Sequence, residues 1–422
     1  MDINQLLQGV DCPCEKKHTC DIEYVYIERN ATQRLREICR KNRDILIVAD
    51  ENTLAAAGEG VVAALKGKRL SKVVFSGTTL LVPNETAIAK VTNHLGTVDL
   101  IIGIGSGVIQ DLCKYVSFYN KVPYIIVATA PSMDGYASDG AAMIIGGMKV
   151  TYKAGLPRAI LANTQVLANA PIDMIKAGYG DIIGKFSALN DWKLSHCVNG
   201  EYFCDYIYNL TFEQIKTTLA LADGIQKRDK KSIKALMEAL VIVGILMSFA
   251  GSSRPASGSE HHLSHFFEIT GILAKSEYFP HGIDVAYSTV ITAKLREKLL
   301  EKPFPQKIYR PEGSEYTEKM EYLYRSSAKG CMDLQEKMGR YKNNNVQMYL
   351  DKETEIRQIL AEMPTAEEIE KMLSLVGLDI NEFYALYGEE KINDAILYAK
   401  DLKDRYTVLW LNYDLFGDNR NA

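Results

Sequence analysis

The sequence has no apolar run long enough to cross a membrane and no excess of positive charge. Its longest apolar stretch, residues 239–250, falls short of the roughly 20 residues that a spanning helix needs, so it predicts a buried helix. The 49 Lys and Arg residues are balanced by 53 Asp and Glu, which argues against a strongly cationic nucleic-acid-binding protein. Residues 1–17 lack the basic start and apolar run of a secretory signal. We therefore expect a soluble, cytoplasmic protein with no membrane span and no nucleic-acid partner.

Cysteine is also sparse, with eight residues in 422, and a long intracellular chain keeps such thiols reduced. The N-terminal stretch concentrates them, because Cys12, Cys14, His18 and Cys20 place four metal-ligand side chains within nine residues. One interpretation is a surface loop, and the other is a small structural zinc site. The Cys-x-Cys spacing is not that of a standard zinc knuckle and no second pair is obvious, so the sequence leaves both interpretations open.

The middle of the N-terminal half alternates between short apolar strands and helices. A length of 422 residues predicts two or three domains, and a hydrophobic fraction of 47% is typical of a globular protein. The alternation from about residue 21 predicts a parallel sheet with helices on both faces. We expect strands at 22–27, 45–49, 73–75, 100–104 and 124–127, and helices at 31–41, 54–65, 84–95 and 108–120, the first three capped by Asn30, Asn52-Thr53 and Asn84.

The alternation ends near residue 165. Residues 142–145 and 149–152 flank Gly146-Gly147 and predict a hairpin, and 159–162 predicts one more strand. Long helical patterns follow Pro171 and continue to the end of the chain. Residues 236–249 are apolar almost all round, so we expect them at the centre of a helical bundle.

These patterns predict an α/β dinucleotide-binding domain over residues 1–165, built on a parallel sheet, and an all-α domain over residues 166–422. The second domain would bind metal and substrate. Three prolines make residues 302–311 the expected exposed link inside the helical part. The last hundred residues are amphipathic helices rich in Glu and Lys, and their sequence reveals no chemistry.

A glycine-rich turn, Gly103-Ile104-Gly105-Ser106-Gly107, follows an expected strand and opens an expected helix. Glycines at such a turn let backbone N–H groups approach a pyrophosphate, whose negative charge the helix N-terminus favours. The turn is neither the usual G-x-G-x-x-G fingerprint nor a P-loop. A plain strand-to-helix turn is therefore the alternative to a cofactor site.

Two further features support a dinucleotide at this turn. Asp50 ends an earlier strand, where a carboxylate accepts hydrogen bonds from ribose hydroxyls and repels a 2′-phosphate, so we expect NAD rather than NADP. The loop 129–132 follows the neighbouring strand, at the edge of the sheet where such ligands bind. Asp111 and Lys114 either pair within their helix or contact the cofactor.

Four of the seven histidines fall between residues 261 and 281, after a break rich in serine and glycine. His261 and His265 are four apart and project from one face of a helix, whereas His262 points about 100° away and is structural or solvent-facing. His261, His281 and a carboxylate would form an open divalent-metal site of catalytic type. Asp181, at the expected start of a helix, is the best carboxylate, and a plain helix cap is its alternative role.

With these motifs the sequence resembles the sn-glycerol-1-phosphate dehydrogenases, in their bacterial branch, within the dehydroquinate synthase and iron-containing alcohol dehydrogenase superfamily. The resemblance covers about residues 40–300. Its most specific part is Ser-Arg-Pro-Ala-Ser-Gly-Ser-Glu-His at residues 253–261. The other motifs are Gly105-Ser106-Gly107 with Asp111 and Lys114, the segment 129–138, Gly180-Asp181 and His281-Gly282.

The resemblance implies a dehydroquinate synthase-like fold and a set of site residues. The divalent metal, nickel or zinc, would be held by the catalytic residues Asp181, His261 and His281. The substrate would contact Asp134, Asp181 and His265. The cofactor would contact Gly105, Ser106, Gly107, Thr129, Ser132 and Ser138. Two positions depart from the family pattern, because Ser106 replaces a commoner glycine and Asn163 stands where an aspartate is common, so Asn163 is assigned no role.

The resemblance also implies an activity, a metal-dependent, NAD(P)-linked interconversion of glycerone phosphate and sn-glycerol 1-phosphate by hydride transfer at C2, in phospholipid biosynthesis. The alternatives are a polyol dehydrogenase acting on glycerol and a non-catalytic sensor of NAD or a sugar phosphate. Dehydroquinate synthases would have a glutamate in place of Asp181. Arg254 and Lys185 are the cations that we expect at the substrate phosphate. We also expect the protein to form a homo-oligomer, and specifically a homodimer.

Overall fold

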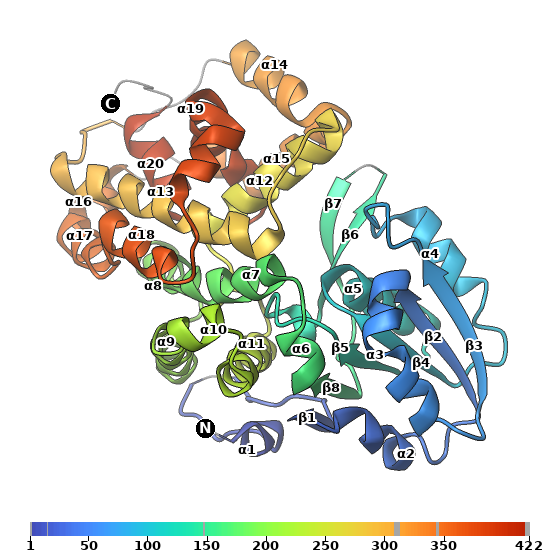
Figure 1. Cartoon of the computed structure of the whole chain (residues 1–422). Coiled ribbons are helices and arrows are strands. Elements are labelled where there is room, and N and C mark those ends of the chain that lie inside the picture. The colour runs from blue at the N-terminus through green and yellow to red at the C-terminus, as the bar shows by residue number, and fades with distance from the viewer. Residues whose placement is uncertain (1, 15, 147, 308–312, 343–345, 418–422) are drawn as a thin grey trace. The chain divides into compact units, whose positions relative to one another are not determined.

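A computed structural model of the chain describes residues 2–14, 16–146, 148–307, 313–342 and 346–417 (Figure 1). The chain divides into two compact units, each formed by two segments. The first unit consists of Met1–Tyr179 and Ala220–Ser253, and the second of Gly180–Leu219 and Arg254–Ala422. The boundary that the sequence predicts near residue 165 lies inside the first unit.

The first unit is built on a six-stranded sheet in which every strand pair is parallel. The strand order is β1-β8-β5-β4-β2-β3 (Figure 1). The predicted α/β fold with a parallel sheet is therefore confirmed. The strands are β1 (Tyr24–Glu28), β2 (Asp44–Asp50), β3 (Arg69–Phe75), β4 (Leu100–Gly105), β5 (Tyr124–Ala128) and β8 (Ala159–Asn163).

Both faces of this sheet are covered by helices, which explains why its central strands are apolar without alternation. Ile45 and Ile47 of β2 belong to a core with the helices of one face, and Leu46 and Val48 belong to a core with the helices of the other. The first face is covered by η1 (Ala31–Arg34), α2 (Leu35–Ile38) and α3 (Glu51–Ala64), and the second by α4 (Glu85–Thr92) and α5 (Gly107–Asn120).

The helix expected over residues 31–41 is shorter than predicted. It is divided into η1 and α2 and ends at Ile38, because the chain must enter β2 at Asp44. Asn30 makes no side-chain capping bond, so its predicted role as a cap is wrong. Asn84 does cap α4, since its side-chain oxygen accepts a hydrogen bond from the N–H of Ala87 at 3.1 Å.

The start of α3 also differs from the prediction. The helix begins at Glu51, and its cap is Asp50 rather than Asn52 or Thr53. The Asp50 carboxylate accepts a hydrogen bond from the N–H of Thr53 at 2.9 Å, and the Thr53 hydroxyl oxygen accepts one from the N–H of Asp50. The two hydrogen bonds together form a capping box. The carboxylate expected to bind ribose therefore also stabilises a helix end.

The remaining elements of the first unit include the predicted hairpin. β6 (Gly140–Ile145) and β7 (Met148–Lys153) pair in antiparallel fashion, with Gly147 outside the described residues. The unit also contains most of α7 (Ile172–Ile183). Its other short helices are α1 (Ile3–Leu7), η2 (Gly135–Ala137), α6 (Thr164–Ala168) and α10 (Ala222–Gln226).

The long apolar helix α11 (Lys230–Ala250) is a core helix of the first unit. By length and composition it could cross a membrane, but most of its apolar window is buried inside the fold. Nearly all of residues 236–249 are buried as predicted, but they lie in the first unit and not in the helical second domain to which the sequence assigns them. Its neighbours within the unit include η2, α6, α10 and β1.

The regular secondary structure in the described residues of the second unit consists of helices alone. α12 (Ser259–Ala274) packs along α13 (His281–Glu301), and these two helices carry the predicted histidines. Of the expected link at 302–311, residues 308–311 lie outside the described residues. The other helices are α8 (Lys185–Asn199), α9 (Asp205–Leu219), α14 (Gly313–Tyr324), η3 (Arg325–Ser327), α15 (Ala328–Met338), η4 (Arg340–Lys342), α16 (Val346–Asp351), α17 (Glu353–Ala361), α18 (Ala366–Ser374), α19 (Ile380–Tyr398), η5 (Ala399–Leu402) and α20 (Val408–Phe416).

A buried ion pair fixes the start of α12. Arg296 of α13 contacts Asp191 of α8 at 2.8 Å, and both side chains are buried. The Asp191 carboxylate also accepts hydrogen bonds from the backbone N–H groups of Ser259, at 2.6 Å, and Val408, at 2.8 Å. The first turn of α12 is therefore held from α8, α13 and α20 together.

Candidate active site

Three metal-ligand side chains converge in the second unit. Asp181 lies near the end of α7, His261 in the first turn of α12, and His281 is the first residue of α13. Their ligand atoms all lie within 4.8 Å of one another, with Asp181 Oδ1 at 3.6 Å from His261 Nε2. The structure thus brings together the three residues that the sequence predicts as metal ligands. Asp181 is not at the start of a helix, so its alternative role as a helix cap is wrong.

Gly180 explains how α7 comes close enough to present Asp181. A Cβ atom at this position would lie 2.5 Å from the carbonyl oxygen of Gly282 and 2.7 Å from Cβ of Ala286. Only a residue without a side chain allows α7 to approach the first turn of α13 so closely. Asp181 and His281 are brought together by this contact, which gives the Gly180-Asp181 and His281-Gly282 motifs a common physical reason.

Neighbouring side chains orient the two imidazoles. Glu260 Oε1 lies 2.7 Å from Nδ1 of His261, so this carboxylate accepts a hydrogen bond from Nδ1–H and leaves Nε2 facing Asp181. Ser264 Oγ lies 3.3 Å from Nδ1 of His281. Glu260 belongs to the most specific motif, but no pattern in the sequence singles it out, because its role depends on the orientation of the adjacent ring.

The charges at this point suit a cation. Burial would raise the pKa of Asp181, but the charge of the Lys185 ammonium, which donates a hydrogen bond to this carboxylate, outweighs burial and holds that pKa below its usual value. Burial, followed by the charge of Lys185, lowers the pKa of His261 well below 6.5, so its imidazole is neutral. A buried carboxylate with two imidazoles is a donor set that fits a divalent metal ion such as zinc or nickel.

The other two histidines of α12 differ in their surroundings. His265 is half-buried, and its ring centroid lies 6.3 Å from that of His261 and 5.6 Å from that of His281. It therefore lies beside the three predicted metal ligands. His262 is fully buried, which excludes the solvent-facing alternative and leaves the structural one.

The two cations expected at the substrate phosphate are already engaged within the second unit. Lys185 is buried, and its ammonium group donates to Asp181 Oδ1 at 2.6 Å and to the carbonyl of Ala256 at 3.1 Å. The guanidinium of Arg254 is also buried and donates to Glu201 at 2.6 Å and to the carbonyl of Tyr406 at 2.9 Å. Both side chains stabilise the interior of the second unit in this arrangement.

The last hundred residues, whose sequence reveals no chemistry, place two side chains in contact with α13 and with the loop before α12. Tyr387 of α19 donates a hydrogen bond to Asp284 of α13 at 2.9 Å. Lys403, which is only half-buried, lies 3.3 Å from Oγ of Ser257, in the loop before α12. Its charge is one of the influences that lower the pKa of His261. Nothing in the sequence around Lys403 distinguishes it from a surface lysine.

The first unit contains a cleft of about 740 Å³ at the carboxyl ends of the strands. Its lining includes Asp50 after β2, Ser106 after β4 and Thr129 after β5. Ser106 is the N-cap of α5, and Gly105 and Gly107 flank it. A Cβ at Gly105 would lie 2.6 Å from Cβ of Ile109, so the turn requires a glycine there. A volume of about 740 Å³ lies within the range of small-molecule and cofactor sites.

The remaining predicted cofactor residues take part in the internal structure of the first unit. Asp111 accepts a hydrogen bond from the N–H of Ala142 at 3.3 Å and lies 3.5 Å from the ammonium of Lys114. Ser138 donates to the carbonyl of Gly135 at 3.2 Å. Ser132 and Asp134, the latter a predicted substrate contact, are both buried. The described lining of the cleft does not include these four predicted residues.

Comparison with known proteins first defines the class of protein. Residues 26–171 match the family model "Iron-containing alcohol dehydrogenase". The fold is shared with a probable glycerol dehydrogenase from Sinorhizobium meliloti, with a TM-score of 0.61 at 14% identity, over 94% of this chain and 98% of that one. The chain therefore shares its fold with that dehydrogenase, and its residues 26–171 resemble the iron-containing alcohol dehydrogenases.

Sequence relatives then define the family. The glycerol-1-phosphate dehydrogenase [NAD(P)+] of Geobacillus stearothermophilus is 31% identical over 98% of this chain and 99% of its own length. The protein of the same name from Halalkalibacterium halodurans is 28% identical over 95% of this chain and 94% of its own length. The chain belongs to the glycerol-1-phosphate dehydrogenase family, which confirms the resemblance seen in the sequence.

Proposed function

We propose that this protein is an NAD(P)-dependent sn-glycerol-1-phosphate dehydrogenase that interconverts glycerone phosphate and sn-glycerol 1-phosphate. The observation that carries the proposal is the convergence of Asp181, His261 and His281 in a chain related over nearly its full length to proteins of that name. The fold alone would be weaker support, because it is shared with a probable glycerol dehydrogenase.

A divalent metal ion, nickel or zinc, would be held by the Asp181 carboxylate and the imidazoles of His261 and His281. When bound, such an ion supplies Lewis-acid polarisation of the substrate oxygen at C2. Lys185 keeps the Asp181 carboxylate charged, and Glu260 fixes the tautomer of His261, so both act as positioning residues.

The cofactor would bind in the cleft of the first unit. Its pyrophosphate would lie at the N-terminus of α5, where Ser106 begins a fourteen-residue helix with unsatisfied backbone N–H groups. Asp50 would accept hydrogen bonds from the ribose hydroxyls and would repel a 2′-phosphate, which favours NAD over NADP. Thr129 lines the same cleft and would contact the cofactor as well.

The substrate would meet two further side chains of the second unit. His265, beside the three ligands, would hydrogen-bond a substrate hydroxyl. We assign the substrate phosphate to Lys403 in place of Arg254 and Lys185, because the latter two are buried and engaged by acidic partners whereas Lys403 is half-exposed near His261. Asp134, in the first unit, stays a predicted substrate contact.

The deciding experiment is an assay of the purified full-length chain with glycerone phosphate and NADH, in parallel with unphosphorylated dihydroxyacetone. We expect turnover of the phosphorylated ketone, its loss after chelation, and its return with added nickel or zinc. His281→Ala should lose activity by orders of magnitude, while the exposed His94→Ala should keep it. Equal turnover of the unphosphorylated ketone would indicate a polyol dehydrogenase, and no turnover with intact NAD binding would indicate a sensor.

A further inference from the structure

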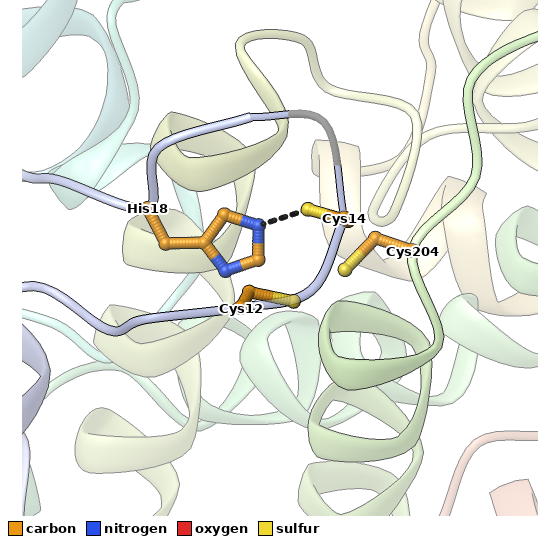
Figure 2. A group of neighbouring side chains, drawn as sticks. All are labelled: Cys12, Cys14, His18 and Cys204. Atoms are coloured by element: carbon orange, nitrogen blue, oxygen red, sulfur yellow. Dashed lines mark hydrogen bonds between the residues drawn. The ribbon is translucent and has the colours of Figure 1, made fainter.

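A second group of metal-ligand side chains lies at the N-terminus of the first unit. Cys12, Cys14 and His18 come from one short loop, and Figure 2 shows them turned toward one another. Their sulfur and nitrogen atoms lie within 4.8 Å of one another, and Sγ of Cys14 is 3.1 Å from Nε2 of His18. These spacings suit ligands that share a single ion of zinc size.

The loop is held in this shape by contacts that do not involve the two thiols. The N–H of Val10 donates to the carbonyl of His18 at 3.0 Å, which closes the loop as an antiparallel bridge. The His18 ring stacks on Phe249 with centroids 5.2 Å apart and is 1% exposed. Lys16 donates to the carbonyl of Ala250 at 2.6 Å. The end of α11 therefore fixes both the imidazole and the backbone that carries the cysteines.

The chemistry of the three residues favours a soft cation. Two thiolates and an imidazole are the ligands that zinc prefers, whereas the Asp181 set offers oxygen and nitrogen only. None of the eight cysteines, all within the described residues, forms a disulfide. Cys20, the fourth member of the cluster in the sequence, is buried and is not part of the group.

We propose that Cys12, Cys14 and His18 bind a zinc ion that stabilises the N-terminal loop. This site is separate from the Asp181 set and does not depend on the proposed dehydrogenase activity. Three ligands leave a fourth tetrahedral position for water or a further thiolate. Cys204, which Figure 2 also draws, belongs to the second unit.

Cobalt substitution tests the proposal, because Co²⁺ bound by thiolates has an intense charge-transfer absorption in the near ultraviolet that oxygen and nitrogen ligands do not produce. We would strip the full-length protein of metal under reducing conditions and titrate it with Co²⁺. The wild type and His281→Ala should both show the thiolate band. The double variant Cys12→Ser/Cys14→Ser should lose it, whereas the buried Cys20→Ser, as matched control, should keep it.

Metal analysis gives an independent readout. Protein with His281→Ala should retain a single tightly bound zinc ion per chain, and adding Cys12→Ser/Cys14→Ser should remove that ion. Should the double variant fail to fold, Cys12→Ser alone must still weaken the thiolate band. A band that survives in a folded double variant, or cobalt binding without any thiolate band in the wild type, would overturn the proposal.

Discussion

Asp50 has two roles, and replacing it by alanine would change both at once. Its carboxylate caps α3 through Thr53, and it lines the cleft where the cofactor ribose is expected. Removing the side chain altogether would cost about 1 kcal/mol of capping as well as the cofactor contact. Serine is also a favourable cap, so Asp50→Ser removes the charge and keeps the capping oxygen.

We therefore expect Asp50→Ser to raise the KM for NAD by roughly 10- to 100-fold, because hydrogen bonds to charged groups contribute about 1.5–3 kcal/mol. The KM for glycerone phosphate should change far less, and the preference for NAD over NADP should shrink. Steady-state kinetics with both cofactors measures this, and Glu59→Ser, exposed on the same helix, is the control. An unchanged KM for NAD would remove Asp50 from the cofactor site.

Lys403 is the residue on which the phosphate assignment rests. We expect Lys403→Gln to raise the KM for glycerone phosphate by about tenfold, since a charge-assisted contact to phosphate would be lost. The KM for NAD should stay the same. The exposed Lys275→Gln is the matched control, and kinetics with both ketones is the measurement. A loss that is equal for the phosphorylated and the unphosphorylated ketone would contradict a phosphate contact.

Sequence patterns predicted some site residues and missed others for identifiable reasons. Asp181, His261 and His281 are visible because few histidines occur and because each stands in a recognisable motif. Glu260 and Lys403 are not, since the role of the first depends on which ring nitrogen faces Asp181 and the second reaches the site only through the fold of the C-terminal helices. Arg254 is conspicuous in its motif, yet its guanidinium is engaged by Glu201.

Among the secondary-structure elements, the strands were the more predictable. β2 and β4 are buried on both faces, so their continuous apolar runs mark them clearly. Helix ends depend on which of several polar residues adopts the capping geometry, and this is why Asp50 rather than Asn52 begins α3. The position of Asp181 within α7 depends on the approach of two helices, which no local pattern records.

The approach of α7 to α13 provides a test at the scale of an element. Gly180→Ala places a methyl group against the carbonyl of Gly282, so we expect a loss of about 1–3 kcal/mol of stability despite the better helix propensity of alanine. Metal affinity should fall too, because Asp181 moves away from His281. Denaturant unfolding and metal titration measure the two effects.

Gly155→Ala is the control for this substitution, since its Cβ would meet only an ordinary contact with Phe118 at 3.5 Å. The two variants differ in whether the added methyl group meets backbone at close range. Full stability and full metal affinity in Gly180→Ala would show that α7 can shift without consequence, and that the glycine is not needed to assemble the three ligands.

At the scale of the whole molecule, the residues predicted to bind NAD and those predicted to bind the metal ion belong to different units. The described cleft lining belongs wholly to the first unit, and Asp181, His261 and His281 belong wholly to the second. Each ligand should therefore stabilise the protein through its own residues, by about 2.7 kcal/mol at a concentration 100-fold above its Kd.

We expect NAD to raise the melting temperature of wild type and His281→Ala alike, and nickel or zinc to raise that of wild type and Asp50→Ser alike. Each variant should lose only the shift that belongs to its own ligand. Differential scanning calorimetry, with and without each ligand, measures these shifts. Loss of the NAD shift in His281→Ala would show that the cofactor site needs the metal ligands.

Arg254 gives the most recognisable stretch of this sequence an unexpected meaning. Its side chain braces Glu201 and the backbone of Tyr406 instead of reaching toward open space. A sequence motif whose arginine makes a structural contact is required by the fold and not by the reaction. We therefore expect the motif to occur also in relatives that act on a different substrate. Searches keyed to it would gather proteins of one architecture, and sorting them by chemistry would have to rely on less conspicuous positions such as Lys403.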